Sequence, residues 1–545
     1  MTKAFSAGMG EQTEQQASWL PMIIISMGQA QMSLNINALP VSIGGIVEEF
    51  NTAPTTVATA IVAYSLAVAG FIMLGAKLSQ MFGALTVFRL ATVVLCGSMV
   101  MMTFSPNVAV MIAAQGIAGL AAAAIVPTLV VLIANNYSGK QQAKALGILG
   151  AVQAMATVTA FFVAGVVGTY LGWRYAFGLV IPFSAITLFL TLRLKPVAKV
   201  PEVKIDGVGV ILAATSVILI SLGVNNLNNW GLMLANTLAP FNVLGLSPAL
   251  LMLIVGLVGI QLFVAWAQRR QARHETPLLA LEVIQSPQER AAVYSMMSIV
   301  ILGNALTFLV PLYIQMVQGR SSFDTAVAMI PYQLSVFTAA ILVVGLYDRL
   351  APRQIARYSF VLVSIAMALL AFVMKNDWSN WLVVLGLVMF GLGQGALVTL
   401  LFNVLVTSSP KELAGDVGSL RGTVNNLSAG VGSAIAGALV VGILSMNINS
   451  ALVENPTIPA ALIEQVDLDR ATFVSNDRLL GVMSRTTATS EQVDEAVRIN
   501  AEARLKALKL TFLLMAALAL LVIVPSGRLP GYIRGQGPSG QPPKV

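Results

Sequence analysis

Charged residues are scarce in this 545-residue chain, because Asp, Glu, Lys and Arg together make up only 10% of it. A soluble domain carries about 25%. Hydrophobic residues make up 57% of the chain, too much to be buried in the core of a water-soluble domain. These proportions exclude the soluble α/β and all-β classes and predict an all-α integral membrane protein.

The chain has one cysteine, Cys96, and one histidine, His274. A single cysteine excludes an intrachain disulfide and a thiolate metal cluster. His274 lies in a charged loop, and no Asp or Glu lies in the middle of an apolar run, so no embedded acid–base or nucleophilic site is indicated. No phosphate-binding loop of the G-x-x-x-x-G-K-[ST] type occurs. We therefore expect no enzyme, no cofactor and no metal site.

The 31 basic residues outnumber the 23 acidic ones and give a net charge of +8. They are scattered between apolar segments, whereas nucleic-acid binding needs a basic stripe or patch. A nucleic-acid partner is therefore not expected. In a membrane protein such a surplus instead indicates which loops lie in the cytoplasm.

Membrane crossings are indicated by apolar runs of about 20 residues, the length of helix that spans the hydrocarbon of a bilayer. The first 17 residues are polar and lack the features of a cleaved signal, so the first run is expected to be an uncleaved span. Fourteen runs qualify, and this even number places both chain ends on one side of the membrane. The runs lie near residues 18–42, 55–75, 86–104, 107–133, 143–167, 173–194, 207–224, 248–267, 291–316, 323–346, 354–374, 381–405, 423–445 and 505–524.

The orientation follows from the Lys and Arg residues of the short connections. With the N-terminus in the cytoplasm, most of them lie on the cytoplasmic side, and only Arg174, Arg320 and Lys375 fall in short outer loops. Both termini are therefore predicted to be cytoplasmic, in a bacterial-type inner membrane, and we expect a monomer.

One long outer segment, residues 447–504, separates the last two runs. Thr489 and Gln492 have the spacing of a helix capping box, ahead of an apolar periodic stretch. We expect a helical hairpin here, which covers the outer vestibule or docks an extracytoplasmic protein partner. Residues 525–545 are rich in Gly and Pro and are expected to form a disordered cytoplasmic tail.

The two halves of the chain share short motifs, as is common in transporters. The inner loop Ala76–Gly83 after the second run matches Val344–Ala351 after the tenth, and Gln115-Gly116 matches Gln394-Gly395. The repeat predicts two six-helix bundles with two inserted helices between them. The expected domains are a tail at 1–17, a bundle at 18–194, a linker with the inserted helices at 195–290, and a second bundle at 291–524.

Three further stretches occur in a characteristic order: Ala38-Leu39-Pro40, then Trp173–Phe177 with Ile181-Pro182, then Pro311–Gln315 with Gln318-Gly319 and Ile330-Pro331. With the inner-loop motifs they make residues of about 20 to 445 resemble the fourteen-helix drug-efflux branch of the major facilitator superfamily. The resemblance implies two bundles that rock about a central site and export small organic molecules.

The charges of that family's proton-coupled members are missing from the N-terminal half. Gln31 stands where helix 1 of the family carries an acid, Gln80 replaces the aspartate of the first inner loop, and Ile112 replaces the arginine of helix 4. The second inner loop keeps Asp348, Arg349 and Arg353. We therefore expect a translocation path without titratable acids, and an N-terminal half that does not couple to protons in the family's usual way.

A path without fixed charge favours hydrophobic or amphipathic neutral compounds as substrates. Any of its amides could instead join helices, for about 0.6–2 kcal/mol each. The expected gating residues are Asp348, Arg349, Arg353, Gln80, Asp416 and Arg421. The expected substrate-binding residues are Gln31, Asn35, Tyr64, Gln115, Gln153, Asn304, Gln315, Gln394 and Asn403.

Two functional hypotheses remain open on the sequence. The first is a secondary transporter, either a facilitator or one whose coupling rests on Asp324 or Asp416 at a helix end. The second is a non-transporting scaffold or sensor derived from a transporter, with the outer hairpin as its partner surface. Purification with a stoichiometric partner, and no ligand-induced thermal shift, would favour the second.

The missing acids generate a prediction for the purified full-length chain in proteoliposomes. Under an imposed pH gradient we expect substrate to equilibrate across the bilayer without accumulating, because no membrane-embedded acid carries the coupling proton. Uphill accumulation that collapses when a protonophore is added would contradict this expectation and place coupling at Asp324 or Asp416.

Overall fold

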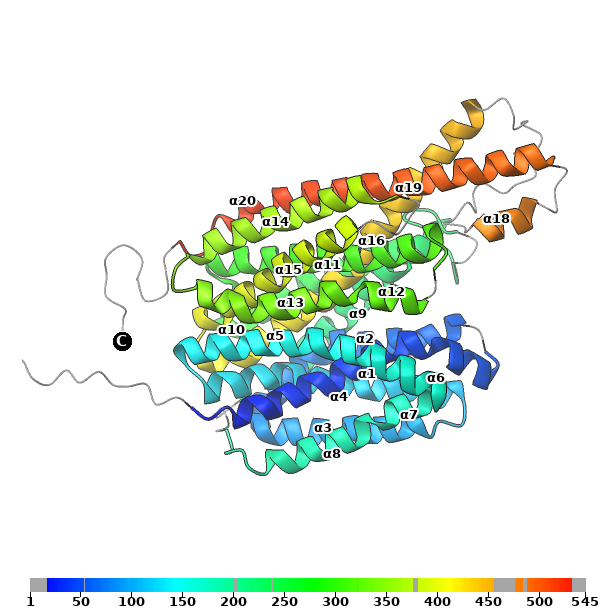
Figure 1. The fold of residues 1–545 in the computed structure, drawn as a ribbon. Helices are drawn as coiled ribbons and strands as arrows, with labels where there is room; N and C mark the ends of the chain where they lie inside the picture. The colour runs from blue at the N-terminus through cyan, green and yellow to red at the C-terminus, as the bar shows by residue number, and fades with distance from the viewer. Residues whose placement is uncertain are drawn as a thin grey trace, which may run out of the picture.

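The computed structural model describes residues 17–52, 54–197, 199, 203–236, 239–320, 322–375, 381–454, 476–483 and 488–531. This part of the chain is helical, with isolated bridges only among Leu234, Val243 and Leu246 and no strand. The prediction of an all-α membrane fold is confirmed. The helices fall into two bundles with a helix pair between them (Figure 1).

The first bundle contains eight labelled helices, of which α5 to α8 form two broken spans. They are α1 (Leu20–Phe50), α2 (Pro54–Phe82), α3 (Ala84–Thr103), α4 (Val108–Asn136), α5 (Gly139–Phe162), α6 (Gly168–Tyr170), α7 (Trp173–Gly178) and α8 (Val180–Thr191). A π-helical turn, Val163–Val167, joins α5 to α6. The inserted pair is α9 (Gly207–Trp230) and α10 (Pro248–Ala272).

The second bundle begins after a short 3-10 turn, Leu281–Ile284. It continues to the end of the described chain and includes two helices that extend well beyond the others. Its helices are α11 (Pro287–Leu312), α12 (Ser322–Ala328), α13 (Ile330–Leu342), α14 (Pro352–Val373), α15 (Trp381–Ser408), α16 (Ala414–Glu454), α18 (Asn476–Met483), α19 (Ser490–Leu521) and α20 (Ile523–Ser526).

Thirteen segments of the described chain are long and apolar enough to cross a membrane. Helix α1 has 31 residues, enough for a crossing, but is not among them. Its amide side chains, which include Gln31, Asn35 and Asn37, lower its apolar content. The count of fourteen crossings therefore stays a prediction, with α1 as the fourteenth candidate.

Helix packing defines how the bundles meet. Helix α9 packs against α10, and also against α2 of the first bundle and α16 of the second. Helices α1 and α20 place both ends of the described chain on one side, which we call the terminal face (Figure 1). The opposite side, where α16 and α19 project, we call the hairpin face. The domain limits predicted from the sequence stay predictions.

Small residues allow the two bundles to approach closely in the half near the terminal face. Helix α5 packs on α13 and α15, and α16 packs on α2 and α4. A Cβ atom on Gly147 would lie 2.6 Å from the carbonyl oxygen of Ala340, and one on Gly418 would lie 3.0 Å from Cα of Pro127. Bulkier residues at these two positions would force the bundles apart.

The hairpin face carries the helical extension that the sequence predicts. Helix α16 has 41 residues and is about 61 Å long at about 1.5 Å per residue, twice the thickness of the hydrocarbon. Thr489 caps α19 in a capping box with Gln492, as predicted. Met483 and Ile499 form a small apolar cluster between α18 and α19. Residues 455–475 and 484–487 of the hairpin lie outside the described residues.

Two boundaries were predicted wrongly. The thirteenth span was expected from 423, but α16 begins at Ala414, so Asp416 and Arg421 are helical. Their charges interrupt the apolar run in the sequence, although tertiary contacts accommodate them in the fold. The disordered tail was expected from 525, but Leu529 is buried and the carbonyl of Pro530 accepts a bond from the backbone N–H of Arg353. Residues 1–16 and 532–545 lie outside the described residues.

Candidate functional site

A buried ion pair joins the two bundles at the terminal face. Nζ of Lys77, near the end of α2, lies 3.0 Å from Oδ1 and 3.3 Å from Oδ2 of Asp416, in the first turn of α16. The side chains are 4% and 0% exposed. Gln80, one turn after Lys77, donates from Nε2 to Oδ2 of Asp416 at 2.7 Å. We call Lys77, Gln80 and Asp416 the buried gate.

The segment that follows the inserted helices completes the hydrogen bonding of this carboxylate. The backbone N–H of Ala280 donates to Oδ1 of Asp416 over 3.1 Å. Oε1 of Gln80 accepts from Lys77 Nζ at 3.2 Å. Both carboxylate oxygens therefore have donors, as a buried ion pair needs if its attraction is to offset the cost of desolvation. The inserted helices are thus tied to the gate through the chain that leaves α10.

A second ion pair lies at the same face but in solvent. Lys140 at the start of α5 and Asp348 in the loop after α13 approach to 2.9 Å, with side chains 73% and 50% exposed. The internal repeat relates the second span to the tenth and the fifth to the thirteenth. The two pairs therefore join corresponding spans with their charges exchanged, although Asp348 aligns with Gln80 rather than with Lys77. An exposed pair contributes about 0–1 kcal/mol, so Lys77–Asp416 is the stronger link.

The structure corrects the expectation that no acid is buried along the path. Asp416 was expected at a helix end; it does lie in the first turn of α16, but it is fully buried between the bundles. Gln80, which stands where the resembled family carries an aspartate, donates to the carboxylate that Asp416 supplies from the opposite bundle. The sequence singled out Gln80 and Asp416 but missed Lys77, Lys140 and Ala280.

The remaining predicted gating residues do not join the buried gate. Arg349 and Arg353 are exposed at the terminal face, and no described side chain of the first bundle bonds to either. Arg421 lies inside α16 with its guanidinium carbon 4.1 Å from the centre of the Phe402 ring. It lies within the helix rather than before the thirteenth span, where the sequence had placed it.

Four of the eight predicted substrate-binding amides join helices within a bundle. Asn35 and Gln115 are both buried and exchange two hydrogen bonds between α1 and α4, of 3.0 and 2.9 Å. Oε1 of Gln31 accepts from Ser184 on α8 at 2.8 Å. In the second bundle Gln394 accepts from the hydroxyl of Tyr332, a residue the sequence did not single out, at 2.7 Å. These contacts match the alternative reading that the amides hold helices together.

The other candidates are dispersed. Gln315 bonds to Thr325 at 3.3 Å, and Asn304 bonds to the carbonyl of Val300 in its own helix at 2.9 Å. Tyr64 is buried, Gln153 is exposed on α5, and Oδ1 of the buried Asn403 has no hydrogen-bond partner. The predicted residues are therefore not gathered in one polar site, and their role in binding stays a prediction.

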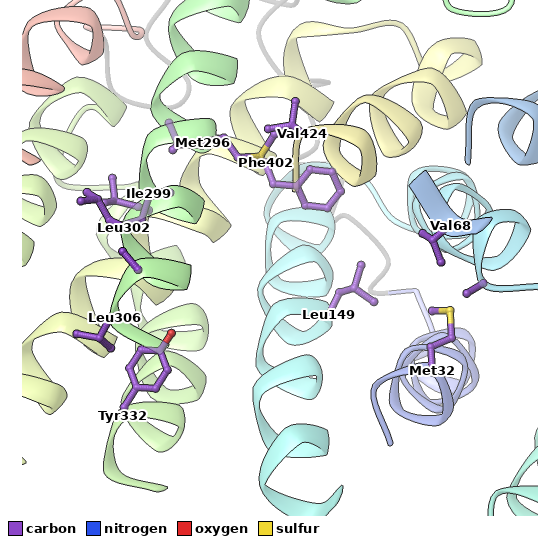
Figure 2. Close-up of a cluster of buried hydrophobic side chains, with 14 of the residues drawn as sticks. Met32, Val68, Leu149, Met296, Ile299, Leu302, Leu306, Tyr332, Phe402 and Val424 are labelled. Atoms are coloured by element: carbon purple, nitrogen blue, oxygen red, sulfur yellow. The ribbon is translucent and has the colours of Figure 1, made fainter. Parts of the chain in front are cut away.

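Apolar side chains from both bundles fill the region beside the gate. Met32 and Val68 of the first bundle, Leu149 of α5, and Phe402 and Val424 of the second bundle belong to one hydrophobic cluster (Figure 2). These side chains are buried, so both bundles contribute to one continuous apolar core.

The burial of the gate predicts unequal effects for its two carboxylates. Asp416→Asn leaves Lys77 buried without a counter-charge, which costs about 3–5 kcal/mol for a buried pair, so the midpoint of thermal unfolding of the purified protein should fall clearly. The Lys77→Met/Asp416→Asn double variant should recover most of the loss. Asp348→Asn, the matched exposed control, should cost at most about 1 kcal/mol. Equal shifts for Asp416→Asn and Asp348→Asn would contradict the buried gate.

Comparison with known proteins agrees with this geometry. The sequence profile of the Major Facilitator Superfamily matches residues 25–433. The riboflavin transporter RibZ of Clostridioides difficile is 23% identical over 79% of this chain and 90% of its own length. The multidrug resistance protein Stp of Mycobacterium tuberculosis is 24% identical over 78% of this chain and 76% of its own.

Solved structures agree on the fold. The human organic anion transporter MFSD10 superposes with a TM-score of 0.58 at 11% identity, over 93% of this chain and 99% of its own. At such low identity the likeness concerns the fold alone. The profile match covers more than half of the sequence. The chain belongs to the major facilitator superfamily of membrane transporters.

Proposed function

We propose that the protein exports hydrophobic or amphipathic organic compounds across a bacterial plasma membrane by alternating access. One observation carries the proposal: Lys77 and Asp416 join the two bundles in a buried contact at one face. The close approaches at Gly147 and Gly418 lie in the same half of the molecule. These contacts support a state in which the path is closed at the terminal face.

The distribution of basic residues supports a cytoplasmic terminal face. The positively charged ends of α2, α5, α10 and the loop after α13 all lie there, as the positive-inside rule predicts for cytoplasmic loops. In this orientation the gate closes the path toward the cytoplasm. A substrate taken up from the cytoplasm would require the gate to open first.

The energetics of the gate suit a switch. Removing the charges of Lys77 and Asp416 from water has a large desolvation cost. Their attraction offsets this cost only while Gln80 and the N–H of Ala280 also donate hydrogen bonds to Asp416. When the bundles rock apart, water replaces these partners and returns the hydration energy. The closed and open states can therefore lie within a few kcal/mol of each other, as alternating access requires.

The relatives support an organic substrate and, in part, the direction. Stp is named for multidrug resistance and RibZ for riboflavin transport. Export in this chain rests on the first of these and on the resemblance to the drug-efflux branch. If transport proves proton-coupled, Asp416 is the carboxylate we assign to it, because its protonation would remove the charge that holds Lys77.

A scaffold or sensor remains the alternative function. The extension of α16 and α19 with α18 at the hairpin face would be its partner surface. Such a protein would not need to alternate between open and closed states. A variant that prevents closure of the buried gate would therefore leave its activity intact.

A glycine pair tests whether the closed state is part of a transport cycle. Gly147→Leu would place a side chain against Ala340 of the other bundle, whereas a Cβ atom on Gly97 meets nothing within 4 Å. We expect Gly147→Leu to reduce flux to about a tenth or less and Gly97→Leu to leave it unchanged. The assay follows uptake of ethidium, rhodamine 6G and riboflavin into everted membrane vesicles.

The wild type should take up at least one of these compounds faster than vesicles that lack the protein. The contrary result is a wild type that binds the compounds in a thermal-shift assay but transports none of them, with the same flux as Gly147→Leu. That result would contradict transport and favour the scaffold.

A further inference from the structure

Arg421 is a charged residue well inside the second bundle. It lies seven residues after Ala414, where α16 begins, and so about 10 Å along the helix axis from the terminal end. Its guanidinium carbon is 4.1 Å from the centre of the Phe402 ring, a side chain of α15 that is only 1% exposed. Arg421 therefore lies beyond the buried gate, on the side of the hairpin face.

No carboxylate of the described chain neutralises this cation. Arg421 takes part in no hydrogen bond or ion pair there, and Phe402 is its one identified electrostatic contact. Asp416 lies five residues earlier on the same helix, but Lys77, Gln80 and the N–H of Ala280 occupy both of its oxygens. Stacking on a ring attracts the cation but leaves the guanidinium N–H groups without acceptors.

The guanidinium is also accessible. Arg421 is partly exposed, and its nitrogens are not among the enclosed side-chain atoms that lack a partner, so solvent can reach them. Phe402, beneath it, belongs to the same hydrophobic cluster as Leu149 of α5 and Val68 of the first bundle (Figure 2). Arg421 thus stacks on a member of a buried apolar cluster to which both bundles contribute.

Placing a charged side chain within the membrane costs free energy, and such side chains are usually paired with an opposite charge or a polar group. Arg421 is therefore expected to have a partner. An arginine stays protonated in a protein, so Arg421 cannot avoid the cost by losing its charge. The planar fork of a guanidinium matches the two oxygens of a carboxylate or sulfonate. Since the described chain supplies no such group to Arg421, a ligand is the natural source.

We propose that Arg421 binds the anionic group of an amphipathic organic monoanion, whose apolar part lies on the cluster around Phe402. This inference rests on the proposed function and sharpens its substrate class. A neutral ligand was expected from the sequence, on the assumption that the path carries no fixed charge. Arg421 is a fixed positive charge, so that assumption no longer holds. One unpaired cation among apolar side chains suits a single negative charge rather than a polyphosphate.

The test uses three ligands that share one apolar body: 2-naphthoate, 2-naphthamide and 2-naphthylmethylammonium. Binding of tritiated 2-naphthoate to the purified full-length protein is measured by scintillation proximity, with the other two as competitors. The wild type should bind the carboxylate at least about tenfold more tightly than the amide and should reject the ammonium, since hydrogen bonds to a charged group contribute at least that much.

Arg421→Gln should abolish the preference for 2-naphthoate and leave the affinity for 2-naphthamide unchanged, while Arg421→Lys should retain part of the preference. Arg290→Gln is the matched control, because Arg290 is an exposed arginine in the first turn of α11. It should behave as the wild type. Equal binding of the carboxylate and the amide by the wild type, no binding of either, or equal weakening of both in Arg421→Gln would overturn the proposal.

Flux measured on the same preparations separates this inference from the proposed function. A wild type that binds 2-naphthoate through Arg421 but transports no compound would contradict export and leave the anion site standing. A wild type that exports compounds without any preference that depends on Arg421 would overturn the anion site alone.

Discussion

The attraction between Lys77 and Asp416 holds the two halves of this transporter together on one side. The two residues are 339 positions apart in the sequence and come from different bundles. In a chain with few charges, a lysine and an aspartate buried together are stabilised only as a fully hydrogen-bonded group. Gln80 and the N–H of Ala280 are therefore parts of the same interaction, and the loss of any member would weaken the others.

The two ion pairs at this face join corresponding spans of the two bundles but differ in burial. The internal repeat relates the spans of Lys77–Asp416 to those of Lys140–Asp348, with the charges exchanged, yet only the first pair is buried. The segment after α10 also donates to Asp416, through the N–H of Ala280. Any movement of α9 and α10 would act on the buried contact first.

The fold could be predicted from the sequence to a large extent, because hydrocarbon thickness dictates the length of each apolar run. The repeat, the capping box at Thr489 and the all-helical class follow from local patterns. The start of α16 could not be predicted in this way. Asp416 and Arg421 interrupt the apolar run, and only residues distant in sequence, Lys77 and Phe402, make their burial tolerable.

The site was less predictable than the fold, for a related reason. The sequence shows which amides occur at central depth, but not which of them meet. Asn35 and Gln115 satisfy each other, so they are not free to bind a ligand in this state. Conversely, the sequence around Lys77 shows only that the residue lies in a repeated loop, and it does not indicate an ion pair with Asp416. Pairing between bundles is a property of the tertiary structure alone.

The central claim is that the buried gate keeps the bundles together at the terminal face, and a distance across that face tests it most directly. Spin labels at the exposed positions Lys144 of α5 and Arg290 of α11, in a Cys96→Ser background, report the separation by double electron–electron resonance. We expect Asp416→Asn to lengthen and broaden the distance distribution relative to the parent protein. An unchanged distribution would show that other contacts hold the bundles closed.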